Sequence, residues 1–339
     1  MVTQPLQEAG RGLEALEGAL LRGAGRGHVY FSVGKGGVGK TTVSILSSIA
    51  LARHGRTLLA SLDPAKHLLE YLGLRRVARP QRTPAGFEAV QYDVETIARR
   101  VAEEYAVLLR QVMPGLTVVN LDGVVRAVRH APGFEEEVFL RILRELTSRL
   151  GRGLDYLVVD TPPTGVTHRI LNLPRLYMLW LTHLHQLRLK IVSLRYTIAK
   201  IMRQDYKPDD PVLRKLESLM GENKRLADLL RDPARASLIL VATPEPLPVY
   251  ETKTSIRVAR DLGMRVRLIV VNRVLPREMA ERLGTRTTQL EALREVEALD
   301  CGGCEKLVIL HSPEPPRSLE GATRLSSLIL PLEEALVEA

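Results

Sequence analysis

This chain of 339 residues contains the stretch Gly34-Lys35-Gly36-Gly37-Val38-Gly39-Lys40-Thr41-Thr42, which is the strongest indication of its fold. It fits the pattern G-x-x-x-x-G-K-[ST], follows a short apolar run and opens a helical pattern. Its glycines allow consecutive backbone N–H groups to curl around an anion, and the following helix points its positive end at the same place. We therefore expect this stretch to cradle the phosphates of a nucleotide, and a chance glycine-rich turn is the weaker alternative.

Four side chains of this loop have predicted roles. Lys40 is expected to reach the β and γ phosphates, the Thr41 hydroxyl to bind Mg²⁺, and Thr42 to lie beside the α phosphate. Lys35 is a second lysine early in the loop, which is typical of the deviant phosphate-loop class, where it reaches the partner subunit's nucleotide as an arginine finger does. We therefore expect Lys35 and Lys40 to be catalytic in a homodimer, with a solvated loop lysine as the alternative for Lys35.

The rest of the chain alternates between strand and helix patterns. Several short runs of Val, Ile and Leu are apolar throughout, as in strands buried on both faces of a parallel sheet. The runs are His28–Val33, Thr57–Leu62, Tyr156–Val159, Ser237–Ala242, Arg265–Val271 and Lys306–Leu310. Helical patterns such as Thr42–Arg53 and Thr252–Asp261 lie between them. The alternation predicts a doubly wound, mostly parallel α/β sheet whose ligands lie at the carboxyl ends of its strands.

Two aspartates follow apolar runs at the sheet edge where the phosphate loop is expected. Asp63 can orient the attacking water or hold Mg²⁺ through water, with a helix N-cap as the alternative. Asp160 ends the run Tyr156–Val159 and is expected to bind the hydration shell of Mg²⁺. Gly165, a little further on, can supply a backbone N–H to the γ phosphate and a hinge. Together they predict the two switches of a nucleotide hydrolase.

Two long segments, 95–133 and 176–231, interrupt the alternation and have helical patterns. The second carries apolar residues at spacings of three and four, which form one stripe along a helix. The stripe consists of Trp180, Leu184, Leu187, Ile191, Leu194, Ile198 and Ile201. The two segments also hold Met113, Met178, Met202 and Met220. A stripe of this kind either lines an adaptable apolar groove or lies buried in a helix–helix core.

In the same order along the chain, these motifs resemble the ATPases that drive arsenite pumps or deliver tail-anchored membrane proteins (the ArsA/Get-type family). The resemblance runs from about His28 to Leu330. It implies a P-loop NTPase fold of the SIMIBI type as a single domain, residues 28–330, in which the two inserted helical segments form a client-binding subdomain. Residues 1–27 would be an N-terminal extension and residues 331–339 a C-terminal tail.

The resemblance also implies roles for residues at the carboxyl ends of other strands. In the family, the aspartate at the position of Asp63 positions the hydrolytic water, and the amide at the position of Asn272 pairs with adenine. Glu245 matches a site that meets the nucleotide, with an ordinary loop carboxylate as the alternative. Pro313 lies where the family places its adenine-covering loop. One departure is Lys66, which stands where the family has histidine.

Cys301 and Cys304 are the two cysteines of the chain, and their C-x-x-C spacing is typical of metal ligands. Two thiolates make half of a tetrahedral zinc site, so a two-fold dimer could complete it. The resemblance supports intersubunit zinc only in part, because the family's pair lies earlier in the chain. A redox pair and a plain turn stay open. So few cysteines indicate a reducing compartment.

The chain carries a formal net charge of +9, with a pI near 9.7. Residues 165–235 hold 14 Lys and Arg against 7 Asp and Glu, so most of the net charge lies around the second helical segment. Aromatic residues make up only 4%, which argues against base stacking, and no nucleic-acid partner is expected. A basic rim instead suits lipid headgroups or an acidic membrane receptor. No charge-free stretch reaches the length of about twenty residues that a membrane span needs. We expect a cytoplasmic protein that meets membranes transiently through partners.

The motifs and the resemblance together predict a Mg²⁺-dependent ATPase that works as a nucleotide-gated homodimer. The leading hypothesis is that it binds tail-anchored membrane proteins in a hydrophobic helical groove and delivers them after hydrolysis. The second hypothesis is an ATPase subunit that drives an arsenite or anion efflux pump. The third is a positioning ATPase similar to MinD and ParA, which would bind DNA or membrane without a client.

Overall fold

The computed structural model describes residues 4–63, 67–74, 78–112, 123, 134–203, 210–314, 316 and 318–338. Its centre is a nine-stranded sheet in the order β3-β4-β2-β5-β1-β6-β7-β8-β9. The strands are β1 His28–Val33, β2 Thr57–Ser61, β3 Gln81–Arg82, β4 Glu88–Gln91, β5 Tyr156–Asp160, β6 Ala236–Ala242, β7 Arg265–Val274, β8 Glu305–Leu310 and β9 Ile329–Pro331. Pairing is parallel from β4 to β8, and β3 and β9 are antiparallel edges. The predicted mostly parallel α/β sheet is confirmed.

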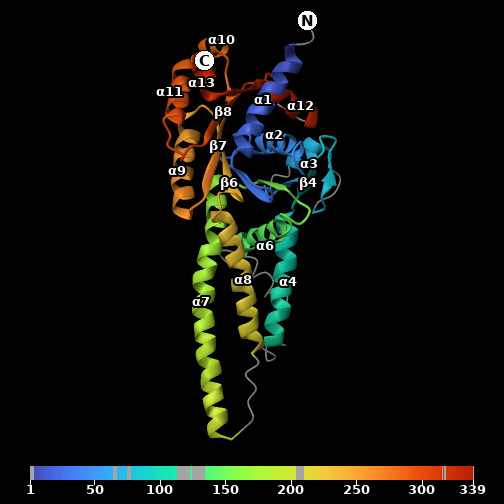
Figure 1. The fold of residues 1–339 in the computed structure, drawn as a ribbon, viewed down its shortest axis with the longest axis vertical. Helices are drawn as coiled ribbons and strands as arrows, with labels where there is room; N and C mark the ends of the chain where they lie inside the picture. The colour runs from blue at the N-terminus through green and yellow to red at the C-terminus, as the bar shows by residue number, and fades with distance from the viewer. Residues whose placement is uncertain are drawn as a thin grey trace.

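Helices cover both faces of this sheet (Figure 1). They are α1 Gln4–Leu21, α2 Lys40–Ala52, α3 His67–Leu72, α4 Val94–Val112, α6 Phe134–Ser148, α7 Thr164–Ile201, α8 Pro211–Arg231, α9 Pro246–Leu262, α10 Arg277–Arg282, α11 Arg286–Glu297, α12 Leu319–Arg324 and α13 Leu332–Glu338, with a 3₁₀ turn η2 at Leu325–Leu328. The strands β3, β4 and β9, which no apolar run indicated, are the shortest of the sheet.

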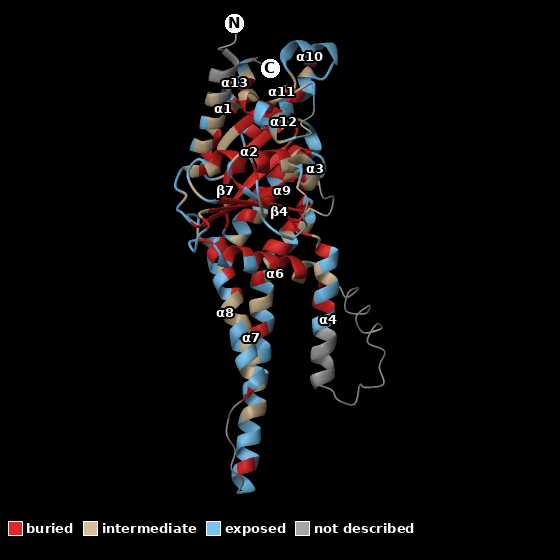
Figure 2. Cartoon of the chain, turned by 90° about the vertical axis from the view of Figure 1, so that its right-hand side faces the viewer, coloured by how far each residue is buried: buried red, intermediate tan, exposed pale blue. Residues whose placement is uncertain are grey.

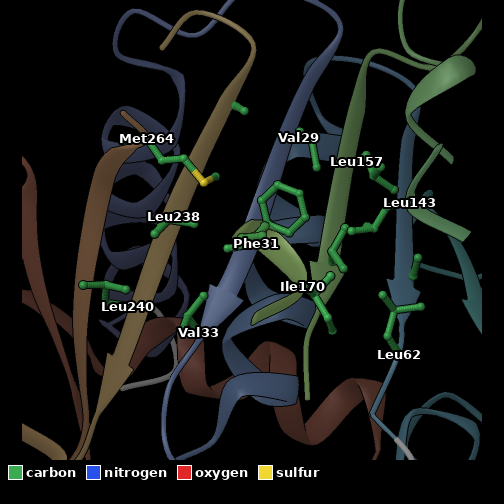
Figure 3. Packing of buried hydrophobic residues seen from close by; sticks show 14 of the residues in the cluster. Val29, Phe31, Val33, Leu62, Leu143, Leu157, Ile170, Leu238, Leu240 and Met264 are labelled. Atoms are coloured by element: carbon green, nitrogen blue, oxygen red, sulfur yellow. The ribbon is translucent and has the colours of Figure 1, made fainter. Parts of the chain in front are cut away.

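The central strands are apolar throughout because each face meets a separate hydrophobic cluster. On β1, Val29 and Phe31 belong to one cluster, and Tyr30 points to the other. Figure 3 shows Phe31 close to neighbouring strands, with Leu143 of α6 and Ile170 of α7 on the same side. Successive strand side chains point to opposite faces, so only an uninterrupted apolar run satisfies both layers.

The helices at the two ends of the chain add to this core. Leu16 and Leu20 of α1 are buried in the cluster that contains Tyr30, whose hydroxyl donates to the Leu20 carbonyl at 2.9 Å. Leu332 and Ala335 of α13 are buried in the other cluster. The described parts of the predicted extension and tail therefore pack on the core of the sheet domain, outside the predicted boundaries 28–330.

Three long helices extend away from the sheet on one side (Figure 1). They are α4, α7 and α8, and α7 and α8 pack along each other. Near the far end of this pair, Arg188 of α7 donates to both carboxylate oxygens of Asp210 at 2.7–3.1 Å, and Asp210 also caps the N-terminus of α8. The two predicted helical segments are thus helical in their described parts, while residues 113–122 and 124–133, with Met113, lie outside them.

The second helical segment begins earlier than its apolar stripe indicates. Pro163 occupies the N-cap of α7, and the helix starts at Thr164, directly after the strand that ends in Asp160. A proline there favours helix initiation, because it has no N–H to leave unpaired. We call the part of the molecule formed by α4, α7 and α8 the projection. The helix α7 therefore runs for 38 residues from the predicted switch to the far end of the projection.

The apolar stripe of α7 is exposed in this structure. Trp180 is 69% exposed, Leu194 62% and Ile201 76%, and Figure 2 shows the outer half of the helix mostly in the exposed colour. The structure therefore decides against the interpretation of the stripe as a buried helix–helix core within one chain. It leaves an apolar face on the projection uncovered by any described part of the chain.

Candidate nucleotide site

The phosphate loop joins β1 to α2 and needs glycine at two places. Gly39 has a φ of 100°, and a Cβ added to it would lie 2.2 Å from the side-chain nitrogen of Asn272. A Cβ on Gly34 would lie 2.2 Å from the carbonyl oxygen of Val241. The first turn of α2 follows the loop directly, and it leaves backbone N–H groups without helical partners. The geometry fits a bound phosphate chain.

Lys40, the first residue of α2, is 5% exposed and folds back over the loop. Its ammonium donates to the backbone carbonyl of Lys35 at 3.2 Å. Burial lowers the pKa of Lys40, while the nearby carboxylates of Asp160, Asp63 and Glu251 act in the opposite direction. A desolvated cation at the phosphate loop is suited to bind phosphate oxygens, and this role of Lys40 stays a prediction.

Asp160, at the end of β5, lies next to Thr41. The Thr41 hydroxyl donates to Asp160 Oδ2 at 2.8 Å, and the Ser61 hydroxyl donates to the same oxygen at 3.2 Å. Burial raises the pKa of Asp160 to about 6. Its other oxygen, Oδ1, is buried without a hydrogen-bond partner in the described structure. Mg²⁺ prefers oxygen ligands, and the Asp160 carboxylate together with the Thr41 hydroxyl provides them.

Asp63 follows β2 at the same edge of the sheet, because β2 and β5 are paired neighbours. It is half-buried, and its backbone is held on both sides. Its N–H donates to the Ser61 hydroxyl at 3.3 Å, and its carbonyl accepts from the Gln91 amide at 3.0 Å. Residues 64–66, including Lys66, lie outside the described part. The structure thus brings Asp63 to the phosphate loop, and its role toward water stays a prediction.

Residues 28–322 match the anion-transporting ATPase family (ArsA ATPase). The chain belongs to this family. The putative arsenical pump-driving ATPase 2 of Aquifex aeolicus is 27% identical over 79% of this chain and 85% of its own length. The ATPase get3 of Schizosaccharomyces japonicus is 27% identical over 88% of this chain and 91% of its own. The arsenical pump-driving ATPase of Acidiphilium multivorum is 25% identical over 90% of this chain and 49% of its own length. The chain is therefore an ATPase of the ArsA/Get3 type.

Asn272 of this ATPase contacts the phosphate loop, which the sequence did not indicate. Its side-chain nitrogen donates to the carbonyl of Val38 at 2.8 Å, and its oxygen accepts from the N–H of Arg273 at 3.0 Å. Arg273 has a φ of 62°, where the pairing of β7 with β8 is irregular. The amide thus pins the phosphate loop to β7. Its contact with adenine stays a prediction.

The remaining predicted nucleotide contacts, Glu245, Pro313 and Lys35, lie on the same edge of the ATPase, where the first two are exposed. Glu245 is the N-cap residue of α9, shortly after β6 ends at Ala242. Pro313 follows β8 in an exposed loop. Lys35 is half-buried, and no residue in the described ranges forms an ion pair or side-chain hydrogen bond with its ammonium. All three therefore stay predictions.

Two hydrogen bonds that the sequence did not indicate join the start of α7 to α9. The Thr164 hydroxyl donates to Glu251 Oε2 at 3.1 Å. One turn later in both helices, His168 Nε2 and Ser255 Oγ lie 3.1 Å apart. Glu251 also acts on Lys40 electrostatically, so this carboxylate lies close to the phosphate loop. The pair of contacts therefore connects the nucleotide site to the first two turns of the projecting helix.

Cys301 and Cys304 are joined in a disulfide, which differs from the prediction of two zinc thiolates. Gly302 and Gly303, both with positive φ, make the turn that brings the cysteines together. A sulfur in a disulfide has no thiolate to offer a metal. In the ranges that the structure describes, no group of three or more His, Cys, Asp or Glu is placed to hold a metal ion. These residues do not fit zinc in the oxidised form, so intersubunit zinc stays a prediction for the reduced protein.

No helix in the described ranges is long and apolar enough to cross a membrane. This includes α7, whose apolar stripe is interrupted by charged and polar residues. Most of the exposed large apolar side chains in the described ranges nevertheless lie on this helix.

Proposed function

We propose that this ATPase works as a nucleotide-gated homodimer that binds the apolar segment of tail-anchored membrane proteins and delivers it after ATP hydrolysis. The observation that supports this most is the exposed apolar stripe of α7. More than half of the exposed large apolar side chains in the described structure lie on this one helix. Exposed patches of this kind on globular proteins mark interaction sites.

The stripe forms a continuous row. Trp180 and Ile198 lie on the same side of α7, because 18 residues make five turns of an α-helix. Leu181 and Ala199 each follow one of these residues and are buried. One residue turns the helix by about 100°, so the stripe lies beside the packed side of α7 rather than under it. An apolar client helix could therefore bind along it without unfolding the projection.

Leucine, isoleucine and methionine suit this task, because flexible aliphatic side chains adapt to clients of different sequence. Met202, at the C-cap of α7, is 60% exposed and extends the stripe. The match of most of this chain to the ATPase get3 of Schizosaccharomyces japonicus supports the proposal.

In this proposal, the nucleotide site controls when the client is bound and released. ATP, when bound with Mg²⁺, supplies the phosphoanhydride bond whose hydrolysis drives the cycle. Thr41 and Asp160 hold the oxygen set for Mg²⁺, and Lys40 neutralises the phosphate oxygens. Asp63 orients the attacking water, and Lys35 reaches the partner subunit's phosphates. A change at the end of β5 is transmitted to α7 because the helix begins four residues after Asp160.

A second candidate is an ATPase subunit that drives an arsenite or anion efflux pump. It is favoured by relatives named arsenical pump-driving ATPase. In that case, arsenite should stimulate ATP hydrolysis, and replacement of both Cys301 and Cys304 by serine should abolish the stimulation. Thiophilic arsenite needs free thiolates, so the reduced protein is the form to assay.

Co-expression with a tail-anchored membrane protein tests the leading proposal. The Asp63→Asn variant should hold the client stably, because hydrolysis is blocked, and the wild type should release it to liposomes with ATP. Leu187→Gln with Ile198→Gln should abolish the complex, while Leu283→Gln, an equally exposed residue near α10, should leave it intact. Failure of Asp63→Asn to hold any client would overturn the targeting role, and the ATPase assignment would stand.

A further inference from the structure

The charged residues of α7 are all positive. Its 38 residues contain no aspartate or glutamate. Arg169 is paired with Glu136, and Arg188 with Asp210. The other cations of the helix are exposed and form no ion pair with any residue that the structure describes. They are Arg175, Lys190, Arg195 and Lys200. The helix thus combines an uncovered apolar stripe with uncompensated positive charge.

Two of these cations border the stripe. At about 100° per residue, Lys190 lies about 80° to one side of the row through Trp180 and Ile198, and Arg195 lies about 60° to the other. Long basic side chains at such positions can extend their charges away from an apolar contact while their stems cover its margin. Apolar residues between flanking lysine and arginine are the pattern of helices that lie in the plane of a membrane surface.

Other occupants explain this arrangement less well. A second copy of α7 would bring uncompensated cations against each other, which like-charge repulsion disfavours. A neutral transmembrane segment would fill the stripe but leave the bordering cations without a counter-charge. A nucleic acid would match the cations but gain little from aliphatic leucine and isoleucine, since base binding needs aromatic stacking.

We propose that α7 docks directly on an anionic lipid surface, with its stripe at the boundary between headgroups and acyl chains. Lys190 and Arg195 then bind headgroup phosphates on either side of the helix. The binding is peripheral, because α7 lacks the apolar length to cross a bilayer. This inference does not depend on the client proposed above, although lipid and client would compete for the same stripe. It adds the membrane as a partner that needs no receptor.

Co-sedimentation of the full chain with vesicles tests the proposal. Vesicles of phosphatidylcholine and phosphatidylglycerol should bind the protein, vesicles of phosphatidylcholine alone should bind it weakly, and salt should reverse the binding. Lys190→Gln with Arg195→Gln should weaken the partition about 30-fold, since each cation near an anionic surface contributes about fivefold. Lys224→Gln with Arg294→Gln, on α8 and α11, removes the same charge elsewhere and should leave the partition within about twofold.

Each other outcome overturns the proposal. Absence of wild-type binding to anionic vesicles would overturn it, and so would equal binding to both vesicle types. An equal loss in the two double variants would show that net charge alone attracts the protein. Single-stranded DNA that binds more tightly than vesicles, and is released by Lys190→Gln with Arg195→Gln, would assign the surface to nucleic acid instead. The client assay stays interpretable in every case, because its capture step, the complex that Asp63→Asn forms on co-expression, uses no vesicles.

Discussion

Thr164 donates its hydroxyl hydrogen to a carboxylate oxygen of Glu251 at 3.1 Å, and this bond joins the first residue of α7 to α9. Thr164 is buried, and the Glu251 carboxylate acts on the ammonium of Lys40. Through Glu251, a change of charge in the phosphate loop therefore acts on the first residue of α7, the helix that carries the apolar stripe. The bond offers a physical route between nucleotide state and client binding.

Replacing this hydroxyl tests the route. Thr164→Val keeps the shape of the side chain but cannot donate, while Thr164→Ser keeps the hydroxyl. We expect Thr164→Val to retain ATP hydrolysis within about tenfold but to make client release independent of ATP, with a stability loss of about 1 kcal/mol. Thr164→Ser should behave as the wild type. Nucleotide-dependent release that is unchanged in Thr164→Val would remove this bond from the account.

The glycines of the phosphate loop differ in what they tolerate. Gly39→Ala forces a Cβ toward Asn272 at a left-handed backbone position, so the nucleotide-free protein should lose about 2 kcal/mol of unfolding free energy. Gly36→Ala meets nothing within 4 Å and should be nearly neutral in the same measurement. Chemical denaturation without nucleotide compares the two, and equal losses would contradict the described loop.

Asp160 should make the nucleotide-free protein less stable as the pH rises. Its folded pKa of about 6 lies above its ordinary value of 3.8, so the folded state binds this proton more tightly than the unfolded state. Its favourable contribution is complete below the unfolded value and is lost as the pH rises through about 6. Relative to Asp160→Asn, the wild type should lose on the order of 3 kcal/mol across this range.

Asp228→Asn, which changes an exposed aspartate on α8, is the control for this titration and should follow the wild type. Denaturation curves that stay parallel for wild type and Asp160→Asn would refute the burial of an ionisable carboxylate. Asp160→Asn should also remove Mg²⁺-dependent ATP hydrolysis, because a neutral amide does not replace a carboxylate near the metal.

Mixing variants tests whether Lys35 acts across a dimer. Lys35→Ala and Asp63→Asn should each be inactive alone, as should Lys40→Ala. In a mixed dimer, however, the intact Asp63 of one subunit meets the intact Lys35 of the other, so mixing the first two variants should restore part of the activity. Mixtures that stay inactive, although the subunits exchange, would contradict a lysine that works on the partner's nucleotide.

The phosphate loop and the Thr41–Asp160 pair could be predicted from the sequence, because parallel strands bring their carboxyl ends to one edge. The Thr164–Glu251 and His168–Ser255 contacts could not. They depend on the register between two helices, which packing sets and local sequence does not. Periodicity likewise indicated the apolar face of α7 but not whether another element covers it, and C-x-x-C spacing did not distinguish metal ligands from the disulfide.

Photo-crosslinking from α7 tests whether the exposed stripe binds the client under nucleotide control. A photoreactive residue in place of Leu187, in the Asp63→Asn background, should form an adduct with a tail-anchored client in the presence of ATP and lose it when ATP is replaced by ADP. The same residue in place of Leu283 should form none. No adduct at Leu187, or equal adducts at both positions regardless of nucleotide, would contradict the account.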